Sequence, residues 1–307
     1  MNMNAETICG FYVTEKRKAV WKTELDMVKL FCEICEKNGL RYMASGGTLL
    51  GAIRHGGFIP WDDDIDLMMP RDDYERFLTL AQDALPAHYA LICNRTERNY
   101  PNGHAQIRDD RTTCLCGYAY DDLKAGKNCG IFIDIFPYDH VPDRPSARKR
   151  MERKIRFVKR MCTWHLYGHE TGNFLKRCVE KVTSGAYFLF HSPEREIERI
   201  NRLSMRPCGQ THTVALISFM PGYERNVWDS SLFDETVPWR FEDILLPVPK
   251  RYDEALTVEF GDYRKLPDDV TGGSMHGQCY FDMDTPYTAF RDKTRAEIDA
   301  LMRDIRL

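Results

Sequence analysis

Four aspartates occupy five consecutive positions of the segment IPWDDDIDLMMP, which covers residues 59–70. Asp62, Asp63 and Asp64 are adjacent, and Asp66 follows after a single isoleucine. Carboxylates held this close repel one another unless a proton or a cation lies between them. The run therefore predicts either a solvated acidic turn or a site that binds a cation, and we favour the cation site.

The segment DIDLMM is typical of a β-strand that ends at Pro70. Side chains two positions apart in a strand point to the same face, so Asp64 and Asp66 are expected side by side. A second predicted strand, CGIFIDIFP, ends at its proline and carries Asp134 among Ile and Phe, where an unpaired carboxylate is costly to bury. If the two strands are neighbours, the three carboxylates converge. Magnesium typically binds one or two such groups together with substrate phosphates.

Gly46-Gly47 stands between a predicted short strand, LRYMAS, and a predicted helix that has Thr48 near its first turn. Glycine lets the backbone approach phosphate oxygens, and a helix N-terminus favours anions. Together with the Asp-x-Asp strand and the later Asp134 strand, this order indicates a nucleotidyltransferase-type site that supports in-line attack at phosphorus. An ordinary tight turn is the alternative for the glycines, and a salt-bridged core acid is the alternative for Asp134.

Hydrophobic periodicity predicts helices at 15–37 and 71–85 and several short strands between about 88 and 120. Residues 145–206 are rich in basic residues and helical in pattern. We therefore expect a single catalytic domain over 1–307 with a helical insertion at about 145–206. With 307 residues, of which 43% are hydrophobic, the chain can bury a sizeable core.

The charge balance and the N-terminus restrict partners and compartment. The net charge of −3 does not suit a chain that coats nucleic acid. No run of about eighteen apolar residues predicts a membrane span, and the N-terminus lacks signal-peptide order, so we expect the cytoplasm. The stretch 144–160 holds nine Lys or Arg residues. It predicts contact with an anionic glycan acceptor or peripheral contact with the inner face of an anionic membrane; a solvated helix face is the alternative.

Eleven cysteines, an odd number without a secretion signal, are expected to be mostly free thiols. Cys32 and Cys35 form a CxxC motif, which suggests redox chemistry or metal binding. Their apolar neighbours recur at helical spacing, however, which favours a small-hydrophobe role on a helix face. Cys114 and Cys116 have no matching second pair at zinc-knuckle spacing, so we do not expect zinc.

The segment GGTLLGAIRHGGFIPWDDDIDLMMPRDDYERF, 46–77, resembles the signature of the LicD family, whose name-giving members are phosphocholine transferases of bacterial surface glycans. FIDIFPYDHVPD, 132–143, and LPVPKRYDEALTVEFGDYRKLP, 246–267, are similar to its second and C-terminal blocks. The resemblance implies an α/β (α+β) fold with a nucleotidyltransferase-like mixed sheet flanked by helices, related to fukutin-type transferases.

The same resemblance implies a chemistry. It implies Mg²⁺ or Mn²⁺, a CDP-linked donor such as CDP-choline, and transfer of the phospho-alcohol to a sugar hydroxyl with release of CMP. The acceptor would be a surface glycan or its lipid-linked precursor, as in lipopolysaccharide, teichoic acid or capsule. Glycerol phosphate, ribitol phosphate and phosphoethanolamine would use the same phosphate chemistry.

The resemblance also places the family's catalytic, metal-binding carboxylates at Asp64, Asp66 and Asp134. Asp134 is expected either to bind a second ion or to accept the proton of the attacking hydroxyl, and the sequence does not separate these roles. Asp62 belongs to the same motif. We expect it either to contact the metal ligands without binding the metal itself or to contact the acceptor.

Substrate-binding residues are expected around the same motif. Arg54 is a candidate phosphate partner because a guanidinium matches phosphate oxygens. Trp61 is a candidate wall of an aromatic cage for choline; packing of the loop is the alternative. The family commonly has a histidine after the DYxKLP block, and His276 is the candidate, with a surface loop histidine as the alternative. The residues expected to cradle the donor phosphates are Gly46, Gly47 and Thr48.

Three other functions compete with this one. A nucleotidyltransferase that moves NMP from an NTP to a small molecule or sugar phosphate would share the metal site but release pyrophosphate. A non-catalytic metal- or nucleotide-binding protein would be expected to lack at least one of the three carboxylates, whereas this sequence has all three. A redox protein that uses Cys32 and Cys35 would lose its activity on thiol alkylation.

Overall fold

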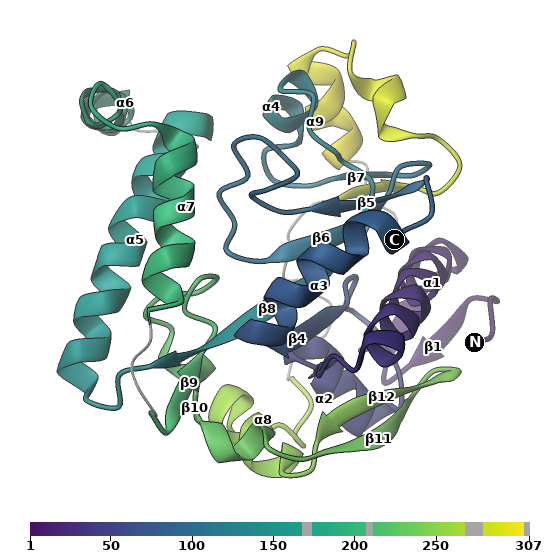
Figure 1. Ribbon diagram of the computed structural model, residues 1–307. Coiled ribbons are helices and arrows are strands. Elements are labelled where there is room, and N and C mark those ends of the chain that lie inside the picture. Colours follow the sequence, from purple (N-terminus) through teal and green to yellow (C-terminus); the bar gives the residue numbers. More distant parts are fainter. Residues whose placement is uncertain (168–173, 207–210, 268–278, 304–307) are drawn as a thin grey trace. The chain divides into compact units, whose positions relative to one another are not determined.

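The computed structural model describes residues 1–167, 174–206, 211–267 and 279–303 (Figure 1). The chain divides into two compact units. Unit 1 comprises Met1–Ile92, Gln106–Ile135 and Leu232–Leu307, and unit 2 comprises Cys93–Ala105 and Phe136–Ser231. Helices and sheets are mixed along the chain, which confirms the α/β class. The single catalytic domain with an insertion at about 145–206 stays a prediction.

Unit 1 begins with the hairpin β1 (Glu6–Ile8) and β2 (Phe11–Val13), followed by the long helix α1 (Glu15–Asn38). The helix begins after Thr14, whose side-chain oxygen accepts a hydrogen bond from the Arg17 N–H at 3.1 Å. It ends at Gly39, which has the positive φ of 61° that favours glycine. The helix predicted at 15–37 is therefore confirmed.

The glycine pair and the aspartates lie in the next segment. Its elements are β3 (Met43–Ala44), α2 (Gly46–His55), β4 (Asp66–Pro70) and α3 (Arg71–Ala84). Strands β3 and β4 are antiparallel, with Ala44 opposite Leu67. The glycine pair forms the first turn of α2 rather than a break before it, and β4 begins at Asp66 rather than at Asp64.

The following elements place Asp134 beside this segment. They are β5 (Tyr89–Ile92), β6 (Ala105–Asp109), β7 (Thr113–Leu115), α4 (Ala119–Lys124) and β8 (Ile131–Val141). Strand β8 pairs with β4 and β6, and the N–H of Asp134 donates to the carbonyl of Ile65 at 2.9 Å. The expectation that the two aspartate-bearing strands are neighbours is confirmed.

Strand β8 does not end at Pro137, contrary to the sequence prediction. It continues to Val141, and Asp139–Val141 pair with β9 (Thr213–Ala215) in unit 2. A proline lacks the N–H of a central ladder position but is tolerated where that donor is not needed. The proline therefore interrupts the apolar pattern without ending the strand.

Later segments complete unit 1. They are η2 (Ser230–Phe233), β11 (Thr236–Phe241), β12 (Ile244–Pro249), α8 (Tyr252–Phe260), β13 (Tyr280–Asp282), η3 (Tyr287–Phe290) and α9 (Arg295–Arg303). Strands β11 and β12 form a hairpin, and β13 pairs with β7. A disulfide joins Cys116 to Cys279, and this bridge was not predicted. The other eight cysteines of the described residues form no disulfide, Cys35 among them, buried on α1.

Unit 2 contains the basic stretch and the helices that follow it. Its elements are α5 (Pro145–Tyr167), α6 (Phe174–Phe188), α7 (Pro193–Ser204), β9, η1 (Glu224–Asn226) and β10 (Val227–Asp229). The apolar face of α5, including Ile155 and Val158, packs with Ile197 and Ile200 of α7 in one core cluster. In the part of the chain that the structure describes, every helix is too short or too polar to cross a membrane.

Candidate active site

The aspartate run forms two overlapping groups of carboxylates in unit 1. Asp64, Asp66 and Asp134 each offer a carboxylate oxygen within 4.8 Å of the others, and Asp62, Asp63 and Asp64 do the same. Asp64 and Asp134 are only 9% and 7% exposed. The side-by-side arrangement of Asp64 and Asp66 agrees with the alternation expected of a strand. Each group could hold a metal ion.

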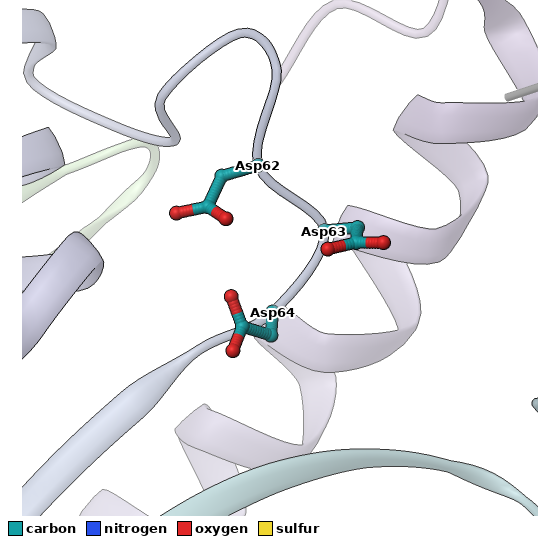
Figure 2. A group of neighbouring side chains, drawn as sticks. All are labelled: Asp62, Asp63 and Asp64. Atoms are coloured by element: carbon teal, nitrogen blue, oxygen red, sulfur yellow. The ribbon is translucent and has the colours of Figure 1, made fainter. Parts of the chain in front are cut away.

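The three consecutive aspartates do not point the same way. Figure 2 shows the carboxylates of Asp62 and Asp64 on one side of the loop, whereas Asp63 points to the other side, toward a neighbouring helix. The charge of Asp63 acts on Arg17 and Glu24, both on α1. Neighbouring aspartates of the run therefore interact with different groups of residues. Asp64 faces Asp66 and Asp134, and Asp63 interacts with buried charges of α1.

The carboxylate group suits a cation. Burial raises the pKa of the Asp64 carboxyl well above its ordinary range, and the negative charges of Asp66 and Asp62 raise it further. A cation between these groups would remove the repulsion that raises the pKa. All three ligand groups are carboxylates, the hard oxygen donors that magnesium and manganese prefer.

Gly46 and Gly47 make room for two of the carboxylates. A Cβ built on Gly46 would lie 2.8 Å from Asp66 Oδ2, and one on Gly47 would lie 2.5 Å from Asp62 Oδ2. Both distances are shorter than real Cβ contacts, so the carboxylates stand against the first turn of α2 only because these residues lack side chains. The positive end of the helix dipole also favours negative charge there. The pair lies in the first turn of α2 rather than in a separate tight turn, and a role in holding phosphate stays a prediction.

Thr48 holds the backbone at the start of β4. Its side-chain oxygen accepts a hydrogen bond from the N–H of Asp66 at 2.8 Å. The N–H of Ser45 donates to the carbonyl of Asp66 at 3.0 Å. Asp66 is thus fixed at both its N–H and its carbonyl by the residues that flank the glycine pair. The expected contact of Thr48 with a donor phosphate stays a prediction.

Gln106 and Arg108 orient Asp134, and the sequence reasoning missed both. Gln106 Nε2 donates to Asp134 Oδ1 at 2.8 Å. Arg108 donates to Gln106 Oε1 through Nε at 2.9 Å and through Nη2 at 2.7 Å. The alternation of HAQIRD predicts a strand with these two polar residues on one face, but it does not identify the residue that they contact.

A second pair of missed residues lies on α1. Arg17 Nη1 donates to the carbonyl of Asp62 at 2.7 Å, and Trp21 Nε1 donates to the same oxygen at 3.0 Å. The two residues are four positions apart and so share one helix face. Trp21 also stacks on Phe58, with ring centroids 4.6 Å apart. Together they fix the peptide at the start of the aspartate run.

Arg54 and Trp61 are neighbours. The Arg54 guanidinium lies 5.8 Å from the centroid of the Trp61 ring, and its Nη1 donates to the carbonyl of Tyr263 at 3.1 Å. The Trp61 ring also makes edge contacts with Phe11 and His55. Burial and, to a smaller extent, the charge of Arg54 together lower the pKa of His55 to about 4. The other predicted residue, His276, lies outside the described residues.

Comparison with known proteins identifies the family. The nucleotidyltransferase domain model LicD/FKTN/FKRP matches residues 39–170, a segment that contains all three predicted metal ligands. The lipopolysaccharide cholinephosphotransferase LicD of Haemophilus influenzae is 32% identical over 250 residues, which are 79% of this chain and 89% of that protein. The chain belongs to the LicD family. It is therefore an enzyme, a LicD-type phosphotransferase.

Two further similarities are shorter. This LicD-family chain is 52% identical to human ribitol 5-phosphate transferase FKRP over 40 residues, 13% of the chain and 8% of that protein. It is 47% identical to an uncharacterised protein of Rickettsia typhi over 63 residues, 20% of each. The resemblance read from the sequence motifs is confirmed at the level of the family.

Proposed function

We propose that this LicD-family enzyme transfers a phospho-alcohol, with phosphocholine from CDP-choline as the first candidate, to a sugar hydroxyl of a cell-surface glycan and releases CMP. The observation that carries the proposal is the convergence of three carboxylates, from Asp64, Asp66 and Asp134, within 4.8 Å. The similarity to the cholinephosphotransferase of Haemophilus influenzae supports phosphocholine and a glycan acceptor. The shorter similarity to the ribitol 5-phosphate transferase FKRP supports, more generally, the transfer of an alcohol together with its phosphate.

Asp64, Asp66 and Asp134 would hold Mg²⁺ or Mn²⁺. The ion, when bound, would neutralise charge on the donor phosphates and on the departing CMP. Gln106 and Arg108 hold the Asp134 carboxylate in one orientation, as is usual for a carboxylate that ligates a metal. We therefore assign Asp134 to metal binding, and the proton acceptor for the sugar hydroxyl is left to another group.

The donor would lie at the N-terminus of α2. The backbone of the glycine pair can approach phosphate oxygens there, with Thr48 beside it and Arg54 as a further partner. Trp61 offers an aromatic ring to a quaternary ammonium, and it already lies 5.8 Å from the Arg54 guanidinium. We propose Trp61 as one wall of a choline site on the strength of this aromatic ring.

The test is to incubate the purified protein with magnesium and each of CDP-choline, CDP-ethanolamine, CDP-glycerol and CDP-ribitol, with and without a glycan acceptor. We expect CMP release from one donor, its loss with a chelator, and its recovery with Mg²⁺ or Mn²⁺. Asp64→Asn should lose release by at least about a hundredfold, more than the loss of an outer hydrogen-bond partner causes. Asp72→Asn, at an exposed aspartate of α3, is the matched control.

Two outcomes would overturn the proposal. Undiminished CMP release in Asp64→Asn would remove the metal assignment. Pyrophosphate release from CTP or ATP, with no CMP from any CDP-alcohol in the presence of acceptor, would favour the nucleotidyltransferase alternative instead.

A further inference from the structure

Helix α6 of unit 2 buries polar residues and exposes apolar ones. Glu180 and Ser184, one turn apart, are only 4% and 2% exposed. Leu175, Val179 and Val182 are 74%, 63% and 71% exposed. Their spacing of four and then three residues places these three on one face of the helix. The usual amphipathic arrangement is thus reversed, and the apolar face of α6 meets solvent.

Two further exposed apolar residues follow the end of α6 in the chain. Leu189 and Phe190 are 77% and 86% exposed. Phe157 of α5, itself 43% exposed, contacts Tyr187 with ring centroids 5.7 Å apart. Scattered exposed apolar residues are ordinary, but several on one helix face and directly after it indicate an interaction surface. We call the surface formed by Leu175, Val179, Val182, Leu189 and Phe190 the α6 stripe.

Positive charge borders the α6 stripe. At about 100° per residue, Lys176 and Lys181 fall on opposite flanks of α6, between its apolar face and its buried face, and both are exposed. The acidic residue of α6, Glu180, is turned inward. On α5, the exposed residues Lys154 and Arg160 lie one turn on either side of Phe157. Within the described residues, neither Lys154 nor Lys181 forms an ion pair with a carboxylate.

We propose that the α6 stripe docks on the surface of an anionic phospholipid bilayer. Its apolar side chains would enter the boundary between headgroups and acyl chains, and the bordering lysines would contact the lipid phosphates. The 15 residues of α6 are too few to cross a bilayer, which takes about 20, so the helix would lie in the plane of the interface.

Charge favours a bilayer over a second copy of the chain. Two α6 stripes packed face to face would bring the same lysine borders together, and like charges oppose that contact. An anionic lipid surface instead attracts both borders. The proposal does not depend on which donor or head group the active site uses. It adds to the proposed function only by bringing the enzyme to acceptors carried on lipids.

The test is co-sedimentation of the full chain with vesicles of phosphatidylcholine mixed with phosphatidylglycerol, and with vesicles of phosphatidylcholine alone. We expect binding to the anionic vesicles that weakens in high salt. The triple variant Leu175→Ser, Val179→Ser, Val182→Ser should bind them at least about tenfold less, because it removes apolar groups that enter the interface. The matched control, Tyr12→Ser with Leu245→Ser, changes two exposed apolar residues of unit 1 and should bind normally.

Each contrary result has a defined meaning. Failure of the unaltered chain to bind anionic vesicles, or unchanged binding by the triple variant, would overturn the proposal. If sedimentation velocity instead shows a dimer that the triple variant converts to a monomer, a second copy occupies the stripe. CMP release without vesicles separates this proposal from the proposed function: the triple variant should keep it, and Asp64→Asn should lose it yet still bind vesicles.

Discussion

Helices α1 and α6 depart from ordinary amphipathic burial in opposite directions. Helix α1 buries charged residues: Arg17 is 4% exposed and Glu24 is 1% exposed. Helix α6 exposes Leu175, Val179 and Val182. Burying a charge costs free energy unless a partner offsets it, and exposing an apolar stripe forgoes burial free energy. Both departures therefore need a reason outside the helix.

The reason differs between the two helices. Arg17 donates to the carbonyl of Asp62, and the charge of Asp63 acts on its guanidinium, so this buried side chain of α1 supports the aspartate run. The α6 stripe has no comparable group to support in the described part of unit 2. We infer that α1 serves the active site from within the fold, whereas α6 serves a partner outside the chain. Substitutions on the two helices should therefore have very different effects on stability.

The largest effect on stability is expected for Arg17→Met. Removing one member of a buried charged group leaves the others uncompensated, which costs about 3 to 5 kcal/mol. The loss should appear as a reduced free energy of unfolding in urea. Lys22→Met, at an exposed site on the same helix, is the control and should change stability by less than about 0.5 kcal/mol. Equal effects of the two substitutions would show that α1 does not support the site through Arg17.

A smaller effect, on activity rather than folding, is expected for Gln106→Ala. The substitution removes the amide that holds Asp134 Oδ1 at 2.8 Å. Loss of an outer hydrogen-bond partner typically lowers metal affinity or activity 10- to 100-fold, so the magnesium concentration for half-maximal CMP release should rise by about that factor. Saturating magnesium should restore part of the activity, which a purely structural defect would not allow. Gln82→Ala, at an exposed site on α3, should leave the magnesium dependence unchanged.

The sequence predicted the three carboxylates that meet at this site but not the residues that hold them in place. Asp64 and Asp66 are predictable as a pair because they stand two positions apart in one local motif, and Asp134 because a carboxylate among Ile and Phe is conspicuous. Gln106 lies 28 positions from Asp134, and Arg17 lies 45 positions from Asp62. No periodicity reports a contact over such a separation.

For the α6 stripe, the limit of sequence-based prediction lies in the orientation of the helix rather than in a distant contact. The helical pattern predicted for about 145–206 covers this segment, and the structure contains a helix at Phe174–Phe188. The pattern cannot tell which face is buried, because that depends on what packs against the helix. Glu180 and Ser184 occupy the inner face, an arrangement that the rule of apolar residues inside would reverse.

Glu24→Gln should stabilise the protein, and the gain should depend on pH. Burial raises the pKa of Glu24 well above its ordinary value of 4.5, and the charge of Asp63 raises it further. A carboxyl whose pKa is raised in the folded state contributes its full stability at pH values below its pKa in the unfolded chain. That contribution is lost as the pH rises through its pKa in the folded protein. Glutamine does not titrate. We therefore expect equal melting temperatures for the two proteins near pH 4 and a melting temperature a few degrees higher for Glu24→Gln at pH 8. A difference that does not grow with pH would mean that Glu24 is not held in a neutral form.

The smallest effect on stability is expected for Val179→Ser on the α6 stripe. The side chain is 63% exposed, so the substitution gives up little buried area and should change the free energy of unfolding by less than about 0.5 kcal/mol. Val158→Ser, at a buried position of α5, is the contrasting substitution and should cost several times more, because it buries a hydroxyl in the unit 2 core. A large loss for Val179→Ser in urea would mean that the stripe is covered within the chain itself. The contrast with Arg17 would then disappear, and with it the reason to seek an external partner for α6.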